Sequence, residues 1–179
     1  LLKEGNYSGA IEKYDAALNI EKDYRMYYQK GVALKKSGKL EEAKNAFEAC
    51  ASAKPDFEAA YNALGGVYYG MQNYEAAIKN FEKVITSTDK ASTKAKAQKN
   101  LALAYTKLGA KEEANANPQK AIAAYTKAVE NSDYDAAYLA LAKVYSETAQ
   151  YDKSISAAEK ALKYRKSIGK GGPYYYMGV

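Results

Sequence analysis

The side chains that carry out most acid–base and metal chemistry are almost missing from this sequence. It contains no histidine and a single cysteine, Cys50, among 179 residues. A zinc site built from cysteine and histidine needs several such ligands, and a histidine general base is impossible without histidine. A single cysteine also rules out an internal disulfide. We therefore predict no catalytic residue, no metal site and no cofactor, and hence not an enzyme.

Two short motifs resemble catalytic signatures but lack their essential features. The sequence GKGG at 169–172 lacks the spacing and the final Ser or Thr of a P-loop, and it follows an expected helix rather than a strand. The pairs Glu41-Glu42 and Glu112-Glu113 are expected to be exposed helix carboxylates rather than an acid/base pair. The chemistry that remains is binding by lysine, tyrosine and amide side chains.

Residues 58–85 show the elements that must position these side chains. Tyr61, Leu64 and Tyr68 recur at steps of three or four residues, which predicts one face of a helix. A second such stripe, which includes Phe81, follows an expected turn at 72–73. The stretch therefore predicts two short amphipathic helices that face each other.

The same pattern recurs along the chain with two sites that stay small. Small residues at these sites would allow the paired helices to approach closely, while larger apolar residues fill the spaces between pairs. The first-helix site is occupied by Gly31, Gly65, Ala102, Ala142 and Gly178, and the second-helix site by Ala10, Ala43, Ala77, Ala121 and Ser154. Five aligned registers are a strong signal, and the chain resembles the tetratricopeptide repeat, a helix–turn–helix unit of about 34 residues.

This resemblance implies an all-α fold, a right-handed superhelical array of antiparallel helix pairs (a TPR-like α-solenoid). It covers 1–179 as a single domain, with repeats at about 1–22 (partial), 24–57, 58–94, 95–134, 135–168 and 171–179 (partial).

The repeat at 95–134 is ten residues longer than its neighbours. We assign three extra residues before its first helix, which is expected from Ala95 to Gly109, and seven to an insertion at 110–116. Either each helix gains one turn, or the first helix alone continues to about Glu113. Both alternatives predict a projection that the other repeats lack.

In tetratricopeptide repeat proteins the first helices line a concave groove that binds extended peptides or a partner's helix. The residues that the resemblance places on this face combine cations, amides and aromatic rings with few carboxylates. That mixture favours an acidic or carboxylate-ended peptide, and a solvated lysine-rich face is the alternative. The candidate groove residues are Arg25, Tyr28, Lys35, Asn62, Tyr69, Lys96, Lys99, Asn100 and Lys143.

One well-known subclass binds chaperone tails with a two-carboxylate clamp of lysine and asparagine. Here Tyr28 and Val32 stand where the first repeat's Lys and Asn belong, and Ala63 replaces the middle Asn. We therefore reject that specific function. A helical-repeat RNA reader fits the small/aromatic pattern less well than a peptide binder does, and no nucleic acid is expected.

Charge and hydropathy set the remaining limits. The net charge of +6 and the pI near 9.1 favour acidic partners only mildly. No apolar run approaches the roughly 18 residues of a membrane helix. The sequence begins LLKEG, without Met or a signal-like segment. A soluble protein is expected, cytoplasmic or extracytoplasmic after loss of a targeting segment, and the compartment is unknown.

The sequence thus predicts a non-catalytic protein–protein interaction scaffold of unknown partner. The alternative is a structural protomer that self-associates end to end. Leu1-Leu2 and the segment 174–177 are expected to leave apolar faces uncovered, as an incomplete solenoid end would. We therefore expect the chain to belong to a longer array, or its termini to pack on a neighbouring chain.

The small second-helix site yields the first prediction. Ala77→Leu is expected to lower the free energy of unfolding by about 1–3 kcal/mol, because extra methylenes would force the paired helices apart. Lys79→Ala, on the exposed face of the same expected helix, serves as the control and should cost little. Thermal melts of the two variants check this, and an unchanged Ala77→Leu protein would remove the proposed helix contact.

Overall fold

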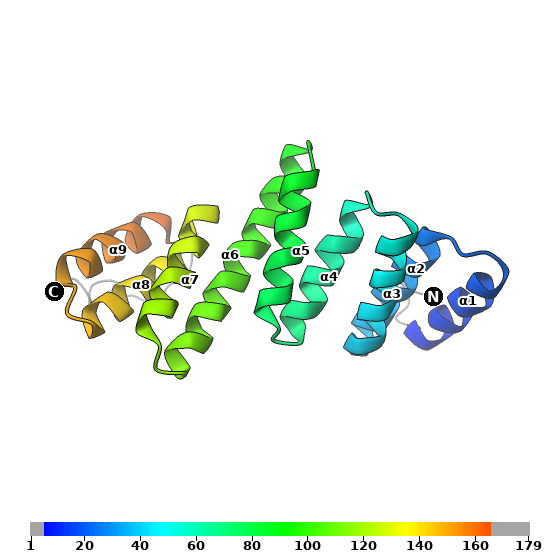
Figure 1. The fold of residues 1–179 in the computed structure, drawn as a ribbon, viewed down its shortest axis with the longest axis horizontal. Coiled ribbons are helices and arrows are strands. Elements are labelled where there is room, and N and C mark those ends of the chain that lie inside the picture. The colour runs from blue at the N-terminus through cyan, green and yellow to red at the C-terminus, as the bar shows by residue number, and fades with distance from the viewer. Residues whose placement is uncertain (1–5, 166–179) are drawn as a thin grey trace. The chain divides into compact units, whose positions relative to one another are not determined.

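The computed structural model describes residues 6–165, and these form nine α-helices and no strand (Figure 1). The predicted all-α class is therefore confirmed. The terminal segments, where we predicted uncovered apolar faces, lie outside the described residues, so end-to-end association stays a prediction. The helices are α1 (Tyr7–Ile20), α2 (Tyr24–Lys36), α3 (Leu40–Ala53), α4 (Glu58–Gly70), α5 (Tyr74–Ser87), α6 (Ala91–Ala114), α7 (Pro118–Asn131), α8 (Asp135–Glu147) and α9 (Tyr151–Tyr164).

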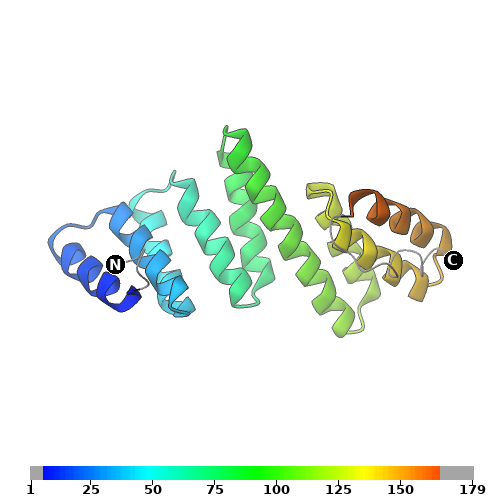
Figure 2. The same ribbon diagram turned by 180° about the vertical axis from the view of Figure 1, so that it is seen from behind.

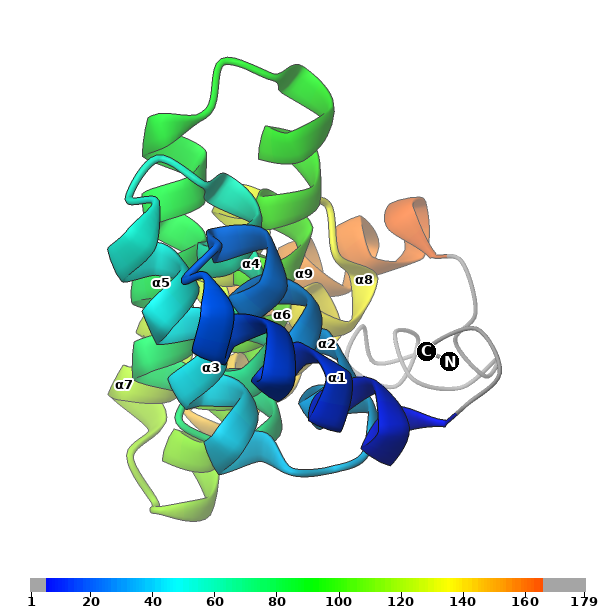
Figure 3. The same cartoon turned by 90° about the vertical axis from the view of Figure 1, so that its right-hand side faces the viewer.

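The chain divides into two compact units, Leu1–Ala97 and Gln98–Val179. The long helix α6 contributes to both, and Figure 2 shows it as one unbroken helix. In the N-terminal unit α2 pairs with α3 and α4 with α5, while α1 packs against α2 (Figure 3). In the C-terminal unit α8 pairs with α9, and α7 packs on α8. Each unit is thus a stack of helical hairpins, as predicted.

Four of the hairpins share one turn conformation. One residue of each turn adopts a left-handed backbone, with φ of 80° at Gly38, 60° at Gln72, 57° at Ala116 and 56° at Ala149. The N–H of the next residue then donates to a carbonyl five residues earlier, at 2.8–2.9 Å, and so satisfies the end of the first helix. Three of these turns accept a conformation that costs a non-glycine residue about 1–2 kcal/mol.

The paired helices meet where a glycine faces an aromatic ring. A Cβ atom added at Gly31 would lie 2.6–2.9 Å from the ring of Phe47. One added at Gly65 would lie 2.5–2.8 Å from Phe81. Both distances are shorter than carbon atoms tolerate. The rings therefore occupy the space that a side chain on the first helix would need, which explains the small first-helix site.

The hairpin of α6 and α7 has a different register from the one we predicted. Gly109, not Ala102, lies against the ring of Tyr125, and a Cβ there would meet that ring at 2.6–2.8 Å. Lys127 lies over Tyr105 as Lys83 lies over Tyr61. Tyr105 therefore occupies the position in its repeat that Tyr61 occupies in the preceding one. The prediction was wrong by seven residues because seven residues are nearly two helical turns, so both registers show the same face.

The extra length of this repeat lies in its first helix alone, one of the two alternatives. Helix α6 has 24 residues where α2, α4 and α8 have 13, while α7 has 14 residues like α3, α5 and α9. It starts at Ala91, four residues before the expected start at Ala95, and ends in the ordinary turn around Ala116. The residues of the expected insertion are thus the end of α6 and this turn. The division into repeats stays a prediction.

The last described hairpin replaces the glycine–ring contact by two alanines. Ala142 on α8 and Ala158 on α9 are both fully buried. The Ser154 hydroxyl, also buried, donates to the Ala142 carbonyl at 2.7 Å. Because α9 has no aromatic ring at this contact, there is room for the methyl group of Ala142 on α8. The small side chains of the two helices therefore compensate one another.

Cys50 and Lys30 are two covered side chains of the N-terminal unit. Cys50 is fully buried, and its burial raises the pKa of the thiol to about 11, so the thiol is unreactive. The Lys30 side chain is largely covered, and its amine forms an ion pair with Asp15 of α1. A lysine is therefore tolerated at a position that is leucine in the next repeat.

The glycine–ring contact leads to the second prediction. Gly65→Ala is expected to lower the free energy of unfolding by about 1–3 kcal/mol, since the methyl group would overlap Phe81. The adjacent Gly66→Ala is the matched control. Its methyl group would meet only the flexible end of Lys35, and an alanine gains up to about 1 kcal/mol of helix propensity over glycine.

Urea unfolding of both variants measures the difference. Gly65→Ala should be the less stable of the two by a clear margin. Equal stabilities would show that the ring of Phe81 moves aside at little cost.

Candidate binding grooves

A groove of about 650 Å³ lies in the N-terminal unit between α2, the α3–α4 loop, α4 and the first turns of α6. We call it the N-terminal groove. It brings together three predicted groove residues from three helices: Tyr28, Asn62 and Lys96. The ring of Tyr28 packs at a tilt against Phe47 and edge-on against Phe57, at 5.6 and 5.3 Å between ring centroids. Partial burial raises the pKa of Tyr28 above its usual value, and the neutral hydroxyl can donate a hydrogen bond.

The charges of the N-terminal groove are mixed. Lys54, Lys90 and Lys96 contribute cations, while Asp56 and Glu58 contribute carboxylates that the sequence pattern did not place there. Lys54 is already paired with Asp56 at 3.0 Å. Within residues 6–165, Lys90 and Lys96 form no ion pair. An anion entering this groove would therefore meet those two amines.

Three other predicted groove residues of this unit are engaged locally. Arg25 forms a bidentate pair with Asp23, the residue that caps α2. The amine of Lys35 lies beside Gly66, and loss of hydration there lowers its pKa. Tyr69 packs edge-on against Tyr74 in its own hairpin, at 5.7 Å between centroids. None of them lines the N-terminal groove.

Lys99 and Asn100 follow Lys96 by three and four residues on α6, so the three share one face of that helix. Both belong to the C-terminal unit. Neither is among the residues that line the N-terminal groove.

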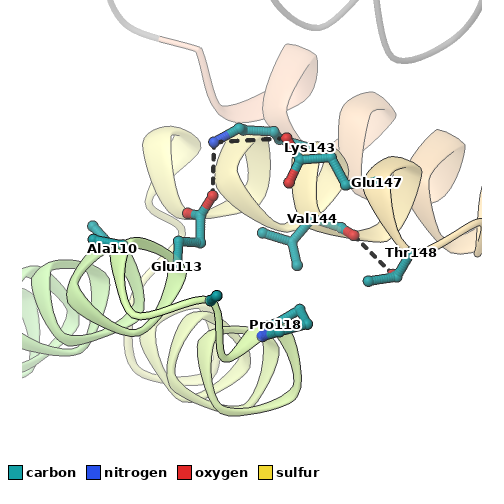
Figure 4. Close-up of a pocket in the computed structure, with 9 residues that line it drawn as sticks. Ala110, Glu113, Pro118, Lys143, Val144, Glu147 and Thr148 are labelled. Carbon is teal, nitrogen blue, oxygen red and sulfur yellow. Dashed lines mark hydrogen bonds and ion pairs between the residues drawn. The ribbon is translucent and has the colours of Figure 1, made fainter.

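The remaining predicted residue, Lys143, lies in a second pocket of about 600 Å³ between the end of α6, the start of α7, and α8 (Figure 4). We call it the C-terminal pocket. The Lys143 amine pairs with Glu113 at 2.7 Å and lies 3.8 Å from Glu147. Two carboxylates therefore surround one cation, and the local charge is negative. Ala110 and Val144 form part of an apolar wall.

Glu113 is the pocket side chain that the sequence pattern missed. We expected an exposed carboxylate, but its side chain is 19% exposed. It accepts a hydrogen bond from the Tyr125 hydroxyl as well as from Lys143. Burial, together with the hydrogen bond that the Tyr125 hydroxyl donates to this carboxylate, raises the pKa of Tyr125 well above its usual range. In the corrected register Glu113 lies one turn past Gly109, on the face of α6 that packs against α7. With that register, the sequence would have predicted a covered carboxylate at Glu113.

Family profiles identify the chain. Tetratricopeptide repeat profiles match residues 24–57, 56–130 and 135–168. The chain belongs to the tetratricopeptide repeat family. Tetratricopeptide repeat (TPR) proteins are generally non-catalytic modules that bind other proteins, so the chain is a protein-interaction scaffold.

Solved structures of similar fold come from this family too. A crystal structure of MamA shares 21% identity over 90% of each chain, with a TM-score of 0.66. MamA from Desulfovibrio magneticus RS-1, residue 41 to the end, shares 24% identity over 91% of this chain and 86% of that one, with a TM-score of 0.64. YrrB shares 15% identity over 100% and 87%, with a TM-score of 0.69. At these identities the likeness shows the fold alone. No curated protein matches the sequence significantly.

Two absences hold for the part of the chain that the structure describes. No cluster of three or more cysteine, aspartate or glutamate side chains is arranged to hold a metal ion. No helix there combines the length and the apolar character that crossing a membrane requires.

The Tyr125–Glu113 hydrogen bond leads to the third prediction. Tyr125→Phe is expected to cost about 1–3 kcal/mol of unfolding free energy, because a largely covered carboxylate loses a donor. The difference from wild type should shrink as the pH rises above about 10. Because folding raises the pKa of Tyr125, its contribution to stability is fully present below the pKa of the unfolded state. That contribution is lost as the pH rises above it.

Tyr61→Phe is the control, because the Tyr61 hydroxyl makes no hydrogen bond within the described residues. Denaturant titrations at neutral pH and above pH 10 measure both variants. Equal losses for Tyr125→Phe and Tyr61→Phe would show that the Glu113 contact does not stabilise the fold.

Proposed function

We propose that this TPR scaffold binds an extended, acidic protein segment in the N-terminal groove. The observation that carries the proposal is the pair of amines at Lys90 and Lys96, which form no ion pair within the described residues and face a groove shared by three helices. Tyr28 and Asn62 supply hydrogen-bonding groups beside them. A carboxylate on the segment would gain charge-assisted hydrogen bonds from these amines.

Several features support a peptide rather than a small molecule. The groove is lined from α2, α4 and α6, so it extends across successive hairpins as an extended segment would. Phe57 and Tyr28 also line it, and their rings suit an apolar side chain between the charged ones. YrrB, which has the same fold, is described as a TPR protein with an unusual peptide-binding site.

The acidic preference applies to the N-terminal groove and not to every predicted residue. Arg25 and Lys143, two of the predicted cations, are already paired with carboxylates. In the C-terminal pocket Glu113 and Glu147 outnumber Lys143, so an acidic segment would be repelled there. We therefore assign the acidic contact to Lys90 and Lys96. Lys99 and Asn100 remain candidates on the same face of α6.

A peptide library displayed on phage tests this proposal. We expect wild-type protein to enrich sequences with Asp or Glu beside an apolar residue. Fluorescence anisotropy on an enriched peptide should show affinity about tenfold or more weaker for Lys90→Glu with Lys96→Glu, because two attractions become repulsions. Both side chains are exposed, so the variant should keep its helical circular dichroism.

A charge-matched control is Lys13→Glu with Lys22→Glu, two exposed lysines that do not line the groove. It should bind as the wild type does. Enriched peptides without acidic residues would contradict the acidic preference. Equal affinity for the groove variant and the control would contradict binding at this groove.

A further inference from the structure

A pocket of about 240 Å³ opens in the C-terminal unit between α7 and α9, over α8. It lies on a different face of α8 from Lys143 and Glu147. Its floor includes Leu141 and Ala157, which are buried. The half-buried rings of Tyr138 and Tyr145 form its walls, and Lys153 and Lys160 stand exposed at its rim. We call it the lysine–tyrosine pocket.

Each rim lysine lies over one ring. The Lys153 amine is 5.6 Å from the centroid of Tyr145, and the Lys160 amine is 5.8 Å from that of Tyr138. Lys153 also donates to the Gln150 side chain at 2.9 Å. No carboxylate lines the pocket. The aromatic faces hold the two cations in place without neutralising them.

The fold itself does not require these cations. The N-terminal unit has a pocket of about 250 Å³ built from the positions 111 residues earlier. In that pocket Glu42 occupies the position equivalent to Lys153, and Ala49 the position equivalent to Lys160, beside Tyr27. The same cavity thus forms without a pair of rim lysines. The pair is therefore a property of the C-terminal unit.

We propose that the lysine–tyrosine pocket binds a second acidic segment of a protein partner, with one apolar side chain on its floor and a carboxylate on each rim lysine. Lys153 and Lys160 are seven residues apart on α9, about 10 Å along the helix. Three residues of a polyproline II chain span nearly the same length, at about 3.1 Å each, and return the side chain to the same face. The preferred segment therefore has carboxylates three residues apart, with the apolar residue between them.

The shape of the pocket favours a protein segment over other anionic partners. Its volume is below the roughly 300–1,000 Å³ of small-molecule sites, and suits one side chain. Nucleic-acid bases bind by stacking on open aromatic faces, whereas both rings here lie under lysines. Membrane binding requires apolar groups that protrude, whereas Leu141 and Ala157 are recessed. The pocket is separate from the N-terminal groove, so this proposal does not depend on binding there.

Nuclear magnetic resonance on the isotope-labelled full chain tests it with the peptide acetyl-Glu-Ala-Leu-Glu-amide. Saturable shifts are expected at the amides of Tyr138, Tyr145, Lys153 and Lys160. The variant Lys153→Glu with Lys160→Ala, which copies the N-terminal unit's residues, should bind at least about tenfold more weakly. Lys22→Glu with Lys13→Ala has the same change of charge in the other unit and should leave these shifts unchanged.

Four results would overturn the proposal. They are no saturable shift at these amides, equal shifts in the pocket variant, equal shifts with acetyl-Gln-Ala-Leu-Gln-amide, and the same shifts from inorganic phosphate alone. Vesicles containing phosphatidylserine are the membrane control. Line broadening at these amides with vesicles, and no shift with the peptide, would assign the pocket to a membrane surface instead.

Discussion

The close approach of paired helices over a small residue is the constraint on which the rest of the structure depends. Gly31, Gly65 and Gly109 each lie against a ring of the following helix. That contact sets the separation of the two helices, and the left-handed turn residue then sets where the second helix begins. Where the ring is missing, at Ala158, alanine can replace the glycine. What recurs from hairpin to hairpin is therefore the combined volume of the two facing side chains, and not one residue type at one site.

The same contact determines where side chains lie in the long repeat. Because Gly109 pairs with Tyr125, the last turns of α6 face α7 and α8, and Glu113 meets both Tyr125 and Lys143. The turns at the start of α6 lie beyond this pairing. They bring Lys96 to the N-terminal groove instead. One helix thus contributes a cation to one site and a carboxylate to another.

Electrostatics distinguishes the candidate binding surfaces from one another. The N-terminal groove presents Lys90 and Lys96, whereas the C-terminal pocket presents two carboxylates around Lys143. Of the two smaller pockets, the one in the C-terminal unit has two lysines where its counterpart in the N-terminal unit has Glu42 and Ala49. Such differences in charge would give the surfaces different preferences for partners, because specificity is a difference of affinities.

The sequence by itself determined the helices, their pairing and the family, because the alternation of small and large residues recurs in every hairpin. It also identified Tyr28, Asn62 and Lys96, which the structure brings into one groove. Only the tertiary structure decided the register of α6, because a slip of seven residues leaves the helix face unchanged. It alone showed the pairing of Arg25 and Lys143 and the burial of Glu113, since these depend on contacts between side chains whose separation in space the periodicity does not specify.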